Sequence, residues 1–402
     1  MIDVSVYSNI IIEGNLKQNR DFVFMHYYNY IFVRVIYFAG KWFFQKYIAL
    51  VYQITTMPDA ATFYRVGEPI KIQDDPIPKI NPDEVLLKIR AASVCHSDVH
   101  VVSGVIPVNG PIVLGHETAG DVEQLGENVE NVKKGDRAIV HFITPCGDCN
   151  FCITGNSNIC KNINSLPMYG FSADGGYAQY MKVNYKRLIT LPSEVPYEFG
   201  ASLCCAGVTA MHAVKSVGKI NLGDIIAVYG TGGVGMYILQ IAKLCGATTT
   251  IAVGRTEEKL QMAQHRFGAD AIINLTKEKL TDGIKKIAGG KGVNAVFDFV
   301  VNNESIDNST KILANAGKLI LVGIGGEPVV VNPKRLTFKE ASVVGSSVGS
   351  KEELQLLVNL ARSGKLKAVA NIKYRLNEVN EVLTALKEGR IVGRAYFDPY
   401  LR

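Results

Sequence analysis

The sequence lacks an uncharged apolar run long enough to cross a membrane. Its most apolar stretch, residues 22–54, is interrupted by Arg34, Lys41 and Lys46, whereas a spanning helix needs about 20 consecutive apolar residues. The amino-terminal segment also lacks the ordered basic start, apolar run and small-residue cleavage site of a secretory signal peptide. We therefore expect no membrane span and a cytoplasmic location.

A strong charge of either sign is also absent. The 402 residues carry a formal net charge of +6, and the basic residues are spread along the chain. This balance gives no reason to expect a nucleic-acid partner. The length predicts two domains with a sizeable core. Eight cysteines without a secretory signal fit a reducing compartment, with most thiols bound to metal.

Four of these cysteines are closely spaced. Cys146, Cys149, Cys152 and Cys160 form a C-x2-C-x2-C-x7-C pattern in a stretch rich in Gly and Asn. Thiolates at this spacing cannot all form unstrained disulfides, but a loop can wrap them around one tetrahedral Zn²⁺. Because four thiolates fill the coordination sphere, we expect this zinc to hold structure and to leave no position for chemistry.

A second set of candidate metal ligands comes from three separate segments. Cys95 is followed by the letters HSDVH, His116 lies between a Gly and a Glu, and Cys205 precedes Ala-Gly. Two cysteines and a histidine would form a three-ligand zinc site whose fourth position stays open to water or substrate. Taken singly, each cysteine also fits a core position, and the adjacent Cys204 is an alternative third ligand.

A glycine-rich turn joins an apolar run to a helical pattern. Residues 225–228 are typical of a buried strand and residues 236–244 of a helix, with Gly230, Gly232 and Gly235 between them. In a Gly-x-Gly-x-x-Gly turn the glycines allow a tight bend, close approach of a pyrophosphate and close helix–strand packing. The phosphates then lie at the positive end of the helix dipole. The turn therefore predicts a dinucleotide site.

The acid that would select NAD is missing from its expected place. Dinucleotide domains that bind NAD carry a carboxylate at the end of the second strand for the ribose 2′-hydroxyl. Here Val253 is followed by Gly254 and Arg255. The Gly makes room, and the Arg offers a forked donor suited to a 2′-phosphate. We therefore expect a preference for NADP(H), with NAD(H) possible. Glu257 and Glu258 begin the next helix, and we expect them to interact with its dipole.

The rest of the chain alternates between strand and helix patterns. Strands are expected at 84–92, 137–142, 225–229, 249–253, 271–273, 295–299 and 319–322. Helices are expected at 201–217, 236–244, 257–267, 282–288 and 305–314. Repeated strand–helix units after residue 225 imply a parallel, doubly wound sheet.

The chain resembles the zinc-dependent medium-chain alcohol dehydrogenases over about the last 346 of its 402 residues. The resemblance rests on five motifs in the family's order: Cys95 with the HSDVH that follows it, His116 between Gly and Glu, the four-cysteine loop, Cys205 before Ala-Gly, and the glycine turn. The resemblance implies an α/β fold with a β-rich GroES-like catalytic domain (57–206 and 346–402) and a dinucleotide-binding Rossmann domain (207–345). It implies hydride transfer between a nicotinamide cofactor and an alcohol, aldehyde or ketone. It further implies two Zn²⁺ per chain, one catalytic and one structural, and a homodimer or homotetramer.

The resemblance also implies roles for residues around the catalytic zinc. Cys95, His116 and Cys205 would bind this zinc, with Cys205 preferred over Cys204 because the family's ligand directly precedes Ala-Gly. The groups implied to act beside these ligands are Glu117 behind the zinc, Ser97 and His100 in a proton relay, and Asp98, which orients the ligands or caps a loop.

Cofactor and substrate contacts follow from the same resemblance. Those implied for the cofactor are His96, Gly230, Gly232, Gly233, Val234, Gly235, Gly254, Arg255, Val322, Gly323 and Arg394. For Arg394 an exposed position at a strand edge is the alternative. Those implied for the substrate pocket are Val101, Val105, Ile106 and one of Phe142 or Ile143, each of which also fits a core position. Their apolar character favours primary or simple secondary alcohols. We expect His141 and His212 to be structural.

Residues 1–56 differ from the rest of the chain. They hold 14 of its 35 aromatic residues (18 Tyr, 16 Phe and one Trp), including Trp42. Because Met57 begins a segment that looks like the usual start of the family, we interpret residues 1–56 as an extension produced by start-site choice. A segment that binds a membrane surface or a partner is the alternative.

Two other functions stay open. One is a polyol or sugar dehydrogenase of the same family, although few hydrogen-bonding residues are expected near the zinc. The other is a structural or regulatory protein that has the fold without the activity. The presence of all three ligands, Cys95, His116 and Cys205, argues against the second.

Overall fold

The computed structural model describes residues 21–27, 31–37, 59–324 and 327–401. It divides the chain into residues 1–57 and residues 58–402. In the first part, β1 (Asp21–Tyr27) and β2 (Ile31–Tyr37) pair antiparallel. The interpretation of residues 1–56 as an extension falls largely outside the described residues and stays a prediction. Among the described residues, no helix is both long and apolar enough to cross a membrane.

A seven-stranded sheet forms the centre of the β-rich part. Its path runs β10-β8-β7-β5-β18-β17, and β9 also pairs with β5. The strands are β5 (Glu84–Ser93), β7 (Glu117–Leu125), β8 (Arg137–Val140), β9 (Tyr180–Asn184), β10 (Leu188–Thr190), β17 (Ala370–Arg375) and β18 (Arg394–Asp398). Apolar side chains of β5 are buried on both of its faces, as its central place requires.

Shorter elements complete this part of the molecule. A three-stranded sheet is formed by β3 (Asp59–Phe63), β4 (Lys71–Asp74) and β6 (Ile112–Val113). The helices are α2 (His96–Val102), α3 (Asn150–Ile153), α11 (Lys351–Arg362) and α12 (Val379–Lys387). The core between them includes Leu87, Ile89, Val113, Tyr177 and Phe397.

A six-stranded parallel sheet forms the second part, in the order β13-β12-β11-β14-β15-β16. The strands are β11 (Ile225–Tyr229), β12 (Thr249–Gly254), β13 (Ala271–Asn274), β14 (Val293–Asp298), β15 (Leu313–Leu321) and β16 (Ser342–Gly345). The helices are α6 (Gly233–Leu244), α7 (Glu257–His265), α8 (Leu280–Ile287), α9 (Asn303–Ile312) and α10 (Pro333–Lys339). This strand order is that of a dinucleotide-binding Rossmann fold.

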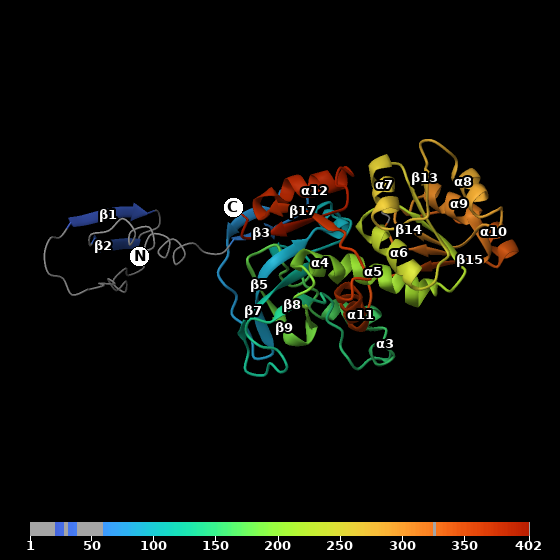
Figure 1. Ribbon diagram of the computed structural model, residues 1–402. Helices are drawn as coiled ribbons and strands as arrows, with labels where there is room; N and C mark the ends of the chain where they lie inside the picture. The colour runs from blue at the N-terminus through green and yellow to red at the C-terminus, as the bar shows by residue number, and fades with distance from the viewer. Residues whose placement is uncertain (1–20, 28–30, 38–58, 325–326, 402) are drawn as a thin grey trace. The chain divides into compact units, whose positions relative to one another are not determined.

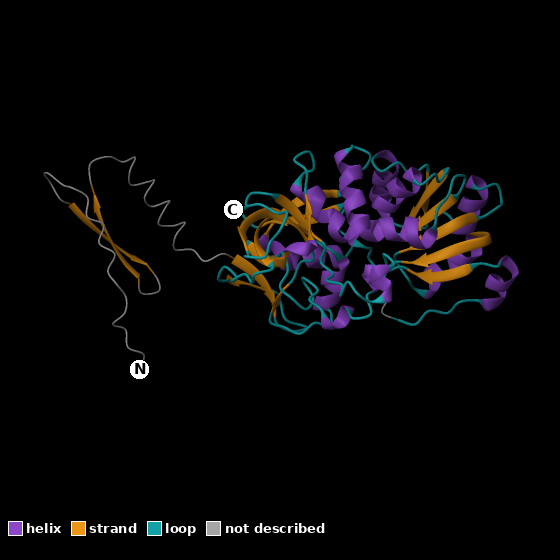
Figure 2. Ribbon diagram, turned by 90° about the horizontal axis from the view of Figure 1, so that it is seen from below, coloured by secondary structure: helices purple, strands orange, loops and turns teal. Residues whose placement is uncertain are grey.

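Alternating residues of β11 explain why the sheet is covered on both faces. Ile226 and Val228 pack with α6 and α7, whereas Ala227 and Tyr229 pack with α8 and α9. Figure 2 shows these strands in orange among the purple helices. The predicted α/β class is therefore confirmed. The sequence-based boundaries differ most at β15, which begins at Leu313.

A long helical segment joins the two sheets (Figure 1). It consists of α4 (Tyr197–Ser202), a π-helical turn at Leu203–Gly207, α5 (Val208–Met211) and a second π-helical turn at His212–Gly218. After β16 the chain returns to the β-rich part through residues 346–350. The predicted domain limits lie within these two connections and stay predictions.

Candidate active site

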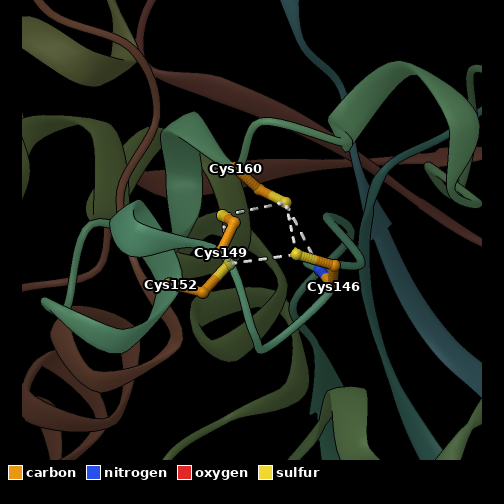
Figure 3. Close-up of side chains that lie close together, drawn as sticks. All are labelled: Cys146, Cys149, Cys152 and Cys160. Carbon is orange, nitrogen blue, oxygen red and sulfur yellow. Dashed lines mark hydrogen bonds between the residues drawn. The ribbon is translucent and has the colours of Figure 1, made fainter.

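The four closely spaced cysteines converge on one point (Figure 3). The Sγ–Sγ distances are 3.4 Å for the Cys149–Cys152 and Cys146–Cys160 pairs, and 3.9 Å for Cys146–Cys152 and Cys149–Cys160. None of the four is in a disulfide. Four sulfurs held at about 2.3 Å from one zinc ion would lie about 3.8 Å apart. The cluster therefore fits a tetrahedral zinc ion.

The second ligand set also converges, although its members come from three parts of the chain. Ligand atoms of Cys95, His116, Glu117 and Cys205 lie within 4.8 Å of one another, and all four residues are buried. Cys95 precedes α2, His116 precedes β7, and Cys205 lies in the first π-helical turn. Nδ1 of His116 lies 3.3 Å from a carboxylate oxygen of Asp98, whereas its Nε2 has no hydrogen-bond partner among the described residues. Because buried polar atoms rarely remain unpaired, this histidine fits a metal ligand.

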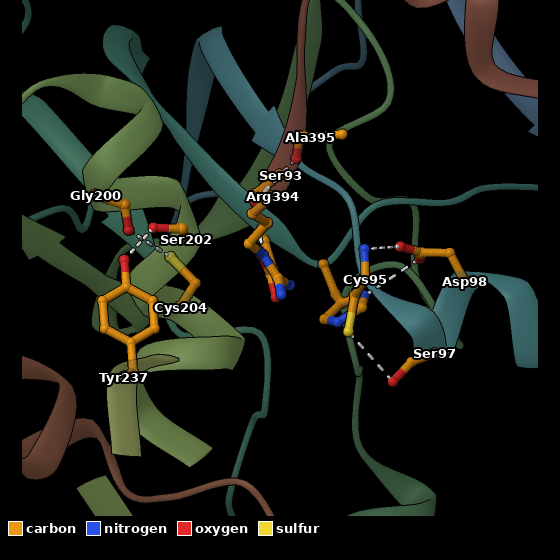
Figure 4. A network of polar contacts seen from close by, with 12 residues as sticks. Ser93, Cys95, Ser97, Asp98, Gly200, Ser202, Cys204, Tyr237, Arg394 and Ala395 are labelled. Carbon is orange, nitrogen blue, oxygen red and sulfur yellow. Dashed lines mark hydrogen bonds and ion pairs between the residues drawn. The ribbon is translucent and has the colours of Figure 1, made fainter. Parts of the chain in front are cut away.

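The structure distinguishes Cys204 from Cys205, the two neighbouring candidates for the third zinc ligand. The thiol of Cys204 lies 3.5 Å from the carbonyl of Gly200 and 3.6 Å from that of Thr118, and Figure 4 shows it away from Cys95. Burial raises the pKa of the Cys204 thiol. Cys205 instead joins the buried cluster. The π-helical turn, a feature common at functional sites, holds both residues.

Asp98 supports the ligands from behind. Its Oδ2 accepts hydrogen bonds from the backbone N–H of Cys95 (3.0 Å) and the hydroxyl of Tyr177 (2.7 Å). Its Oδ1 lies 3.3 Å from Nδ1 of His116. Asp98 therefore contacts the cap of α2 and a predicted ligand at once, and so shows features of both roles suggested for it. Tyr177 has no local sequence signal, because only the fold brings it to Asp98.

Arg394 is buried, with 6% of its surface exposed, so the alternative of an exposed strand-edge arginine is wrong. Its guanidinium is ion-paired with Glu117, and its Nε donates to Ser93 Oγ at 3.0 Å. Burial raises the pKa of Glu117, and the Arg394 charge opposes that rise. The Nη1 atom lies 2.7 Å from the position that a Cβ on Gly233 would occupy. Arg394 therefore lies between the buried cluster and the glycine turn.

The predicted proton-relay residues lie on α2. The Oγ of Ser97 is 3.6 Å from the Sγ of Cys95, and Figure 4 shows the two side chains pointing toward each other. His100 is one turn further along the helix and partly exposed, and its ring centroid is 5.5 Å from that of the exposed His96. The fold thus places a hydroxyl beside the buried ligands and an imidazole nearer to solvent.

The glycine turn has the geometry that its sequence predicts. Gly230 has φ = +107°, a conformation that favours glycine. A Cβ on Gly235 would lie 2.4 Å from the Gly230 carbonyl oxygen, whereas one on Gly232 would meet nothing within 4 Å. The turn is therefore tight at its packed end and open at the start of α6, where Val234 also lies.

The end of β12 carries a glycine and an arginine where an acid would select NAD, and the first acid after it is engaged elsewhere. Gly254 ends the strand and Arg255 follows it with an exposed side chain. Glu257 is engaged by Lys277 (2.8 Å) and Asn274 (2.7 Å), and its hydrogen bonds, above all that from Lys277, lower its pKa to about 2. Glu257 is therefore a partner of β13 and its following loop.

Val322 and Gly323 line a cavity of about 690 Å³ at the carboxyl ends of β15 and β16. His212 lies on another wall of the cavity and bonds to Glu353 (3.0 Å) and Asn158 (3.3 Å). His141 is buried, with its ring nitrogens bonded to the carbonyls of Ile143 and Gly349. Both His141 and His212 therefore hold together segments that are distant in the sequence, as expected for structural residues.

Two aromatic rings lie against His116. The ring centroid of Phe142 is 5.0 Å from that of His116, and the ring of Phe171 is 4.8 Å away. Phe171 was missed from the sequence, because it reaches His116 only through the packing of Gly170 on Gly115. In contrast, Val101 is fully buried in the core, which fits the alternative of a core position for this residue.

The other expected pocket residues divide between core and surface. Ile143 is 2% exposed and belongs to the core, while Val105 is 45% exposed. Ile106 is partly buried and packs against the core.

Comparisons with known proteins were made with this geometry in view. Residues 81–193 match the alcohol dehydrogenase GroES-like domain, and residues 233–363 match the zinc-binding dehydrogenase family. An NAD-dependent alcohol dehydrogenase of Sulfurisphaera tokodaii is 34% identical over 350 residues, which are 85% of this chain and 99% of the relative. The chain belongs to the zinc-dependent medium-chain alcohol dehydrogenases.

Two further members of the family show its range. A D-arabinose 1-dehydrogenase (NADP(+)) of Saccharolobus solfataricus is 35% identical over 349 residues, covering 85% of this chain and 97% of the relative. The crystal structure of an alcohol dehydrogenase from Aeropyrum pernix has a TM-score of 0.78 and 34% identity, covering 85% of this chain and all of that one. Membership of this dehydrogenase family identifies the chain as an enzyme, so a non-enzymatic role is set aside.

Proposed function

We propose that this alcohol dehydrogenase uses Cys95, His116 and Cys205 to hold a catalytic zinc ion, with Glu117 behind it. The convergence of these four buried ligand atoms, with Nε2 of His116 lacking a hydrogen-bond partner in the described part of the chain, carries the proposal. When bound, zinc would supply a Lewis acid for the alcohol oxygen and the nicotinamide cofactor would supply the hydride acceptor. The Cys146–Cys160 cluster would hold a second, structural zinc. Elemental analysis should therefore find two zinc ions per chain in active protein.

Ser97 and His100 would carry the proton. The Ser97 hydroxyl, beside Cys95, would accept the alcohol proton while releasing its own, and His100, which lies nearer to solvent, would release a proton to solvent. Arg394, which is ion-paired with Glu117, would also neutralise charge on the cofactor pyrophosphate. His96, Val322 and Gly323 would complete the cofactor site with the glycine turn.

NADP(H) is the proposed preferred cofactor. Relatives of both kinds exist, since the S. tokodaii enzyme is named NAD-dependent and the S. solfataricus enzyme is named for NADP(+). Support for NADP(H) comes from the exposed Arg255 and from the engagement of Glu257 by Lys277 and Asn274. A charge-assisted contact of Arg255 with the 2′-phosphate is worth about 1.5–3 kcal/mol, or roughly ten- to a hundredfold in affinity.

The cofactor test compares kcat/KM for NADPH and NADH. We expect the wild-type enzyme to prefer NADPH, Arg255→Ala to lose most of that preference, and Gly254→Asp to move it toward NADH. A matched control is Arg266→Ala, since Arg266 lies at the far end of α7 and donates to the carbonyl of Ala368. A wild-type preference for NADH that Arg255→Ala leaves unchanged would contradict the proposal.

The proposed substrates are primary or simple secondary alcohols and the corresponding carbonyl compounds. The two phenylalanine rings against His116 support an apolar pocket. The sugar named for the S. solfataricus relative keeps a polyol or sugar substrate as the second candidate. Rates on a panel of alcohols, aldehydes, ketones, polyols and aldoses separate the two. A homodimer or homotetramer stays a prediction that light scattering tests.

A further inference from the structure

Two histidines on α2 lie side by side. His96 and His100 are four residues apart, and positions with this spacing are neighbours on one face of a helix. Their ring centroids are 5.5 Å apart and the rings are inclined at 60°. His96 is exposed and His100 is partly exposed. The pair is therefore open to a ligand from solvent, unlike the buried His116.

This arrangement has a defined chemistry. Two imidazoles at i and i+4 on one helix face can bind one transition-metal ion together, as the paired histidines of helical zinc sites do. Imidazole suits Cu²⁺, Ni²⁺ and Zn²⁺, whereas Mg²⁺ and Ca²⁺ require oxygen ligands. We propose that His96 and His100 chelate a divalent transition-metal ion at the edge of the cofactor site, separately from both predicted zinc sites.

The surroundings of the two histidines predict weak binding, so that this site fills only when metal is in excess. Cys95 precedes His96 but belongs to the buried cluster, so water would complete the coordination sphere. The cations Lys259 and Arg394 act electrostatically on His96 and weaken the binding of another cation. Each is held by its own partner, since Lys259 donates to the carbonyl of Gly389 (2.6 Å) and Arg394 pairs with Glu117.

Metal bound here would inhibit the enzyme. This consequence rests on the proposed function, in which His96 belongs to the cofactor site and His100 takes part in proton transfer. A chelated ion would occupy both imidazoles and lie where the cofactor binds. Inhibition should therefore be competitive with NADPH and should follow the affinity order Cu²⁺ above Ni²⁺, with no effect of Mg²⁺.

Isothermal titration with NiCl2 tests the site directly, using the untagged, zinc-loaded full chain without cofactor. The variants are His96→Gln, His100→Gln and the control His265→Gln, which removes an exposed histidine of α7 that contacts Gln261. Wild type and the control should bind Ni²⁺ with the same Kd. Either α2 variant should raise Kd by roughly tenfold or more, the loss of about 1.4 kcal/mol or more.

Zinc content is measured before and after each titration, so that displacement at the cysteine clusters is seen separately. Equal Ni²⁺ binding by wild type and both α2 variants would overturn the proposal, as would release of zinc in proportion to the Ni²⁺ taken up. Binding that both α2 substitutions weaken, without inhibition of the wild-type enzyme by Ni²⁺, would support the metal site and contradict the roles proposed for His96 and His100.

Discussion

At the scale of single residues, two adjacent cysteines provide a controlled test of the catalytic zinc. Cys205→Ser should lose one zinc ion and reduce turnover to background, because a three-ligand site loses a thiolate. Cys204→Ser should keep both zinc ions, since its thiol points toward the carbonyls of Thr118 and Gly200. Elemental analysis and kcat on both variants check this. Zinc loss from Cys204→Ser alone would reverse the assignment.

Phe171 gives a second test at this scale. Removing its ring from beside His116 should enlarge the space next to the zinc site and weaken apolar contact with the substrate. Phe171→Ala should therefore raise KM for a bulky aromatic alcohol more than for ethanol, by roughly tenfold if about 1.4 kcal/mol of contact is lost. Phe151→Ala is the control, because that exposed ring lies on α3. Equal changes for both alcohols would place Phe171 outside the substrate pocket.

At the scale of elements, two glycines in the turn between β11 and α6 have different roles, one in packing and one in cofactor binding. Gly235→Ala would force a methyl group against the Gly230 carbonyl and should destabilise the protein by about 1–3 kcal/mol. Gly232→Ala has open space around it, so it should barely change stability yet raise KM for the cofactor, because the pyrophosphate approaches there. Thermal unfolding and cofactor kinetics on both variants distinguish the effects.

The first turn of α11 predicts a pH dependence of stability. Glu353 caps this helix with Ser350 and accepts hydrogen bonds from His212 and Ser216. Burial raises its pKa, but these hydrogen bonds outweigh burial and leave the pKa below the ordinary 4.5. A lowered folded-state pKa stabilises the protein above the unfolded value, and this contribution disappears as the pH falls through the folded value.

Glu353→Gln should therefore lower the melting temperature at pH 7, corresponding to about 1–3 kcal/mol for lost charged hydrogen bonds. The difference from wild type should shrink as the pH falls below about 4.5, the ordinary carboxyl value. Scanning calorimetry between pH 3 and pH 8 measures it. A difference that grows in acid would show that Glu353 is neutral in the folded protein.

The elements that the sequence predicted best are those whose chemistry lies within one short segment. The four cysteines and the glycine turn each fit in about fifteen residues, so their spacing alone indicates zinc and dinucleotide sites. Phe171, Tyr177 and the buried state of Arg394 depend instead on which strands pair. The sequence left Val101 open between pocket and core, because residues near the ligands in sequence need not face them, and the structure buries Val101 in the core.

At the scale of the whole molecule, the division after residue 57 predicts that the enzyme works without its amino-terminal part. Protein starting at Met57 should fold and keep its kcat, because every proposed site residue lies downstream. Its tryptophan fluorescence should vanish, because Trp42 is the only Trp in the chain. Activity assays and emission spectra check this. An inactive product would show that residues 1–56 support the enzyme.

The order of strands in the seven-stranded sheet has a consequence for synthesis on the ribosome. β18 is the last strand of the chain, yet it lies between β5 and β17 and brings Arg394 to Glu117. During translation the residues of the parallel sheet, β11 to β16, emerge before β18, and domains generally fold as units in that order. The nascent chain can thus form its dinucleotide-binding fold early, whereas the region around the catalytic zinc ligands stays incomplete until β18 brings Arg394 to Glu117. Activity should appear only after residues 394–398 have left the ribosome and β18 has paired with β5.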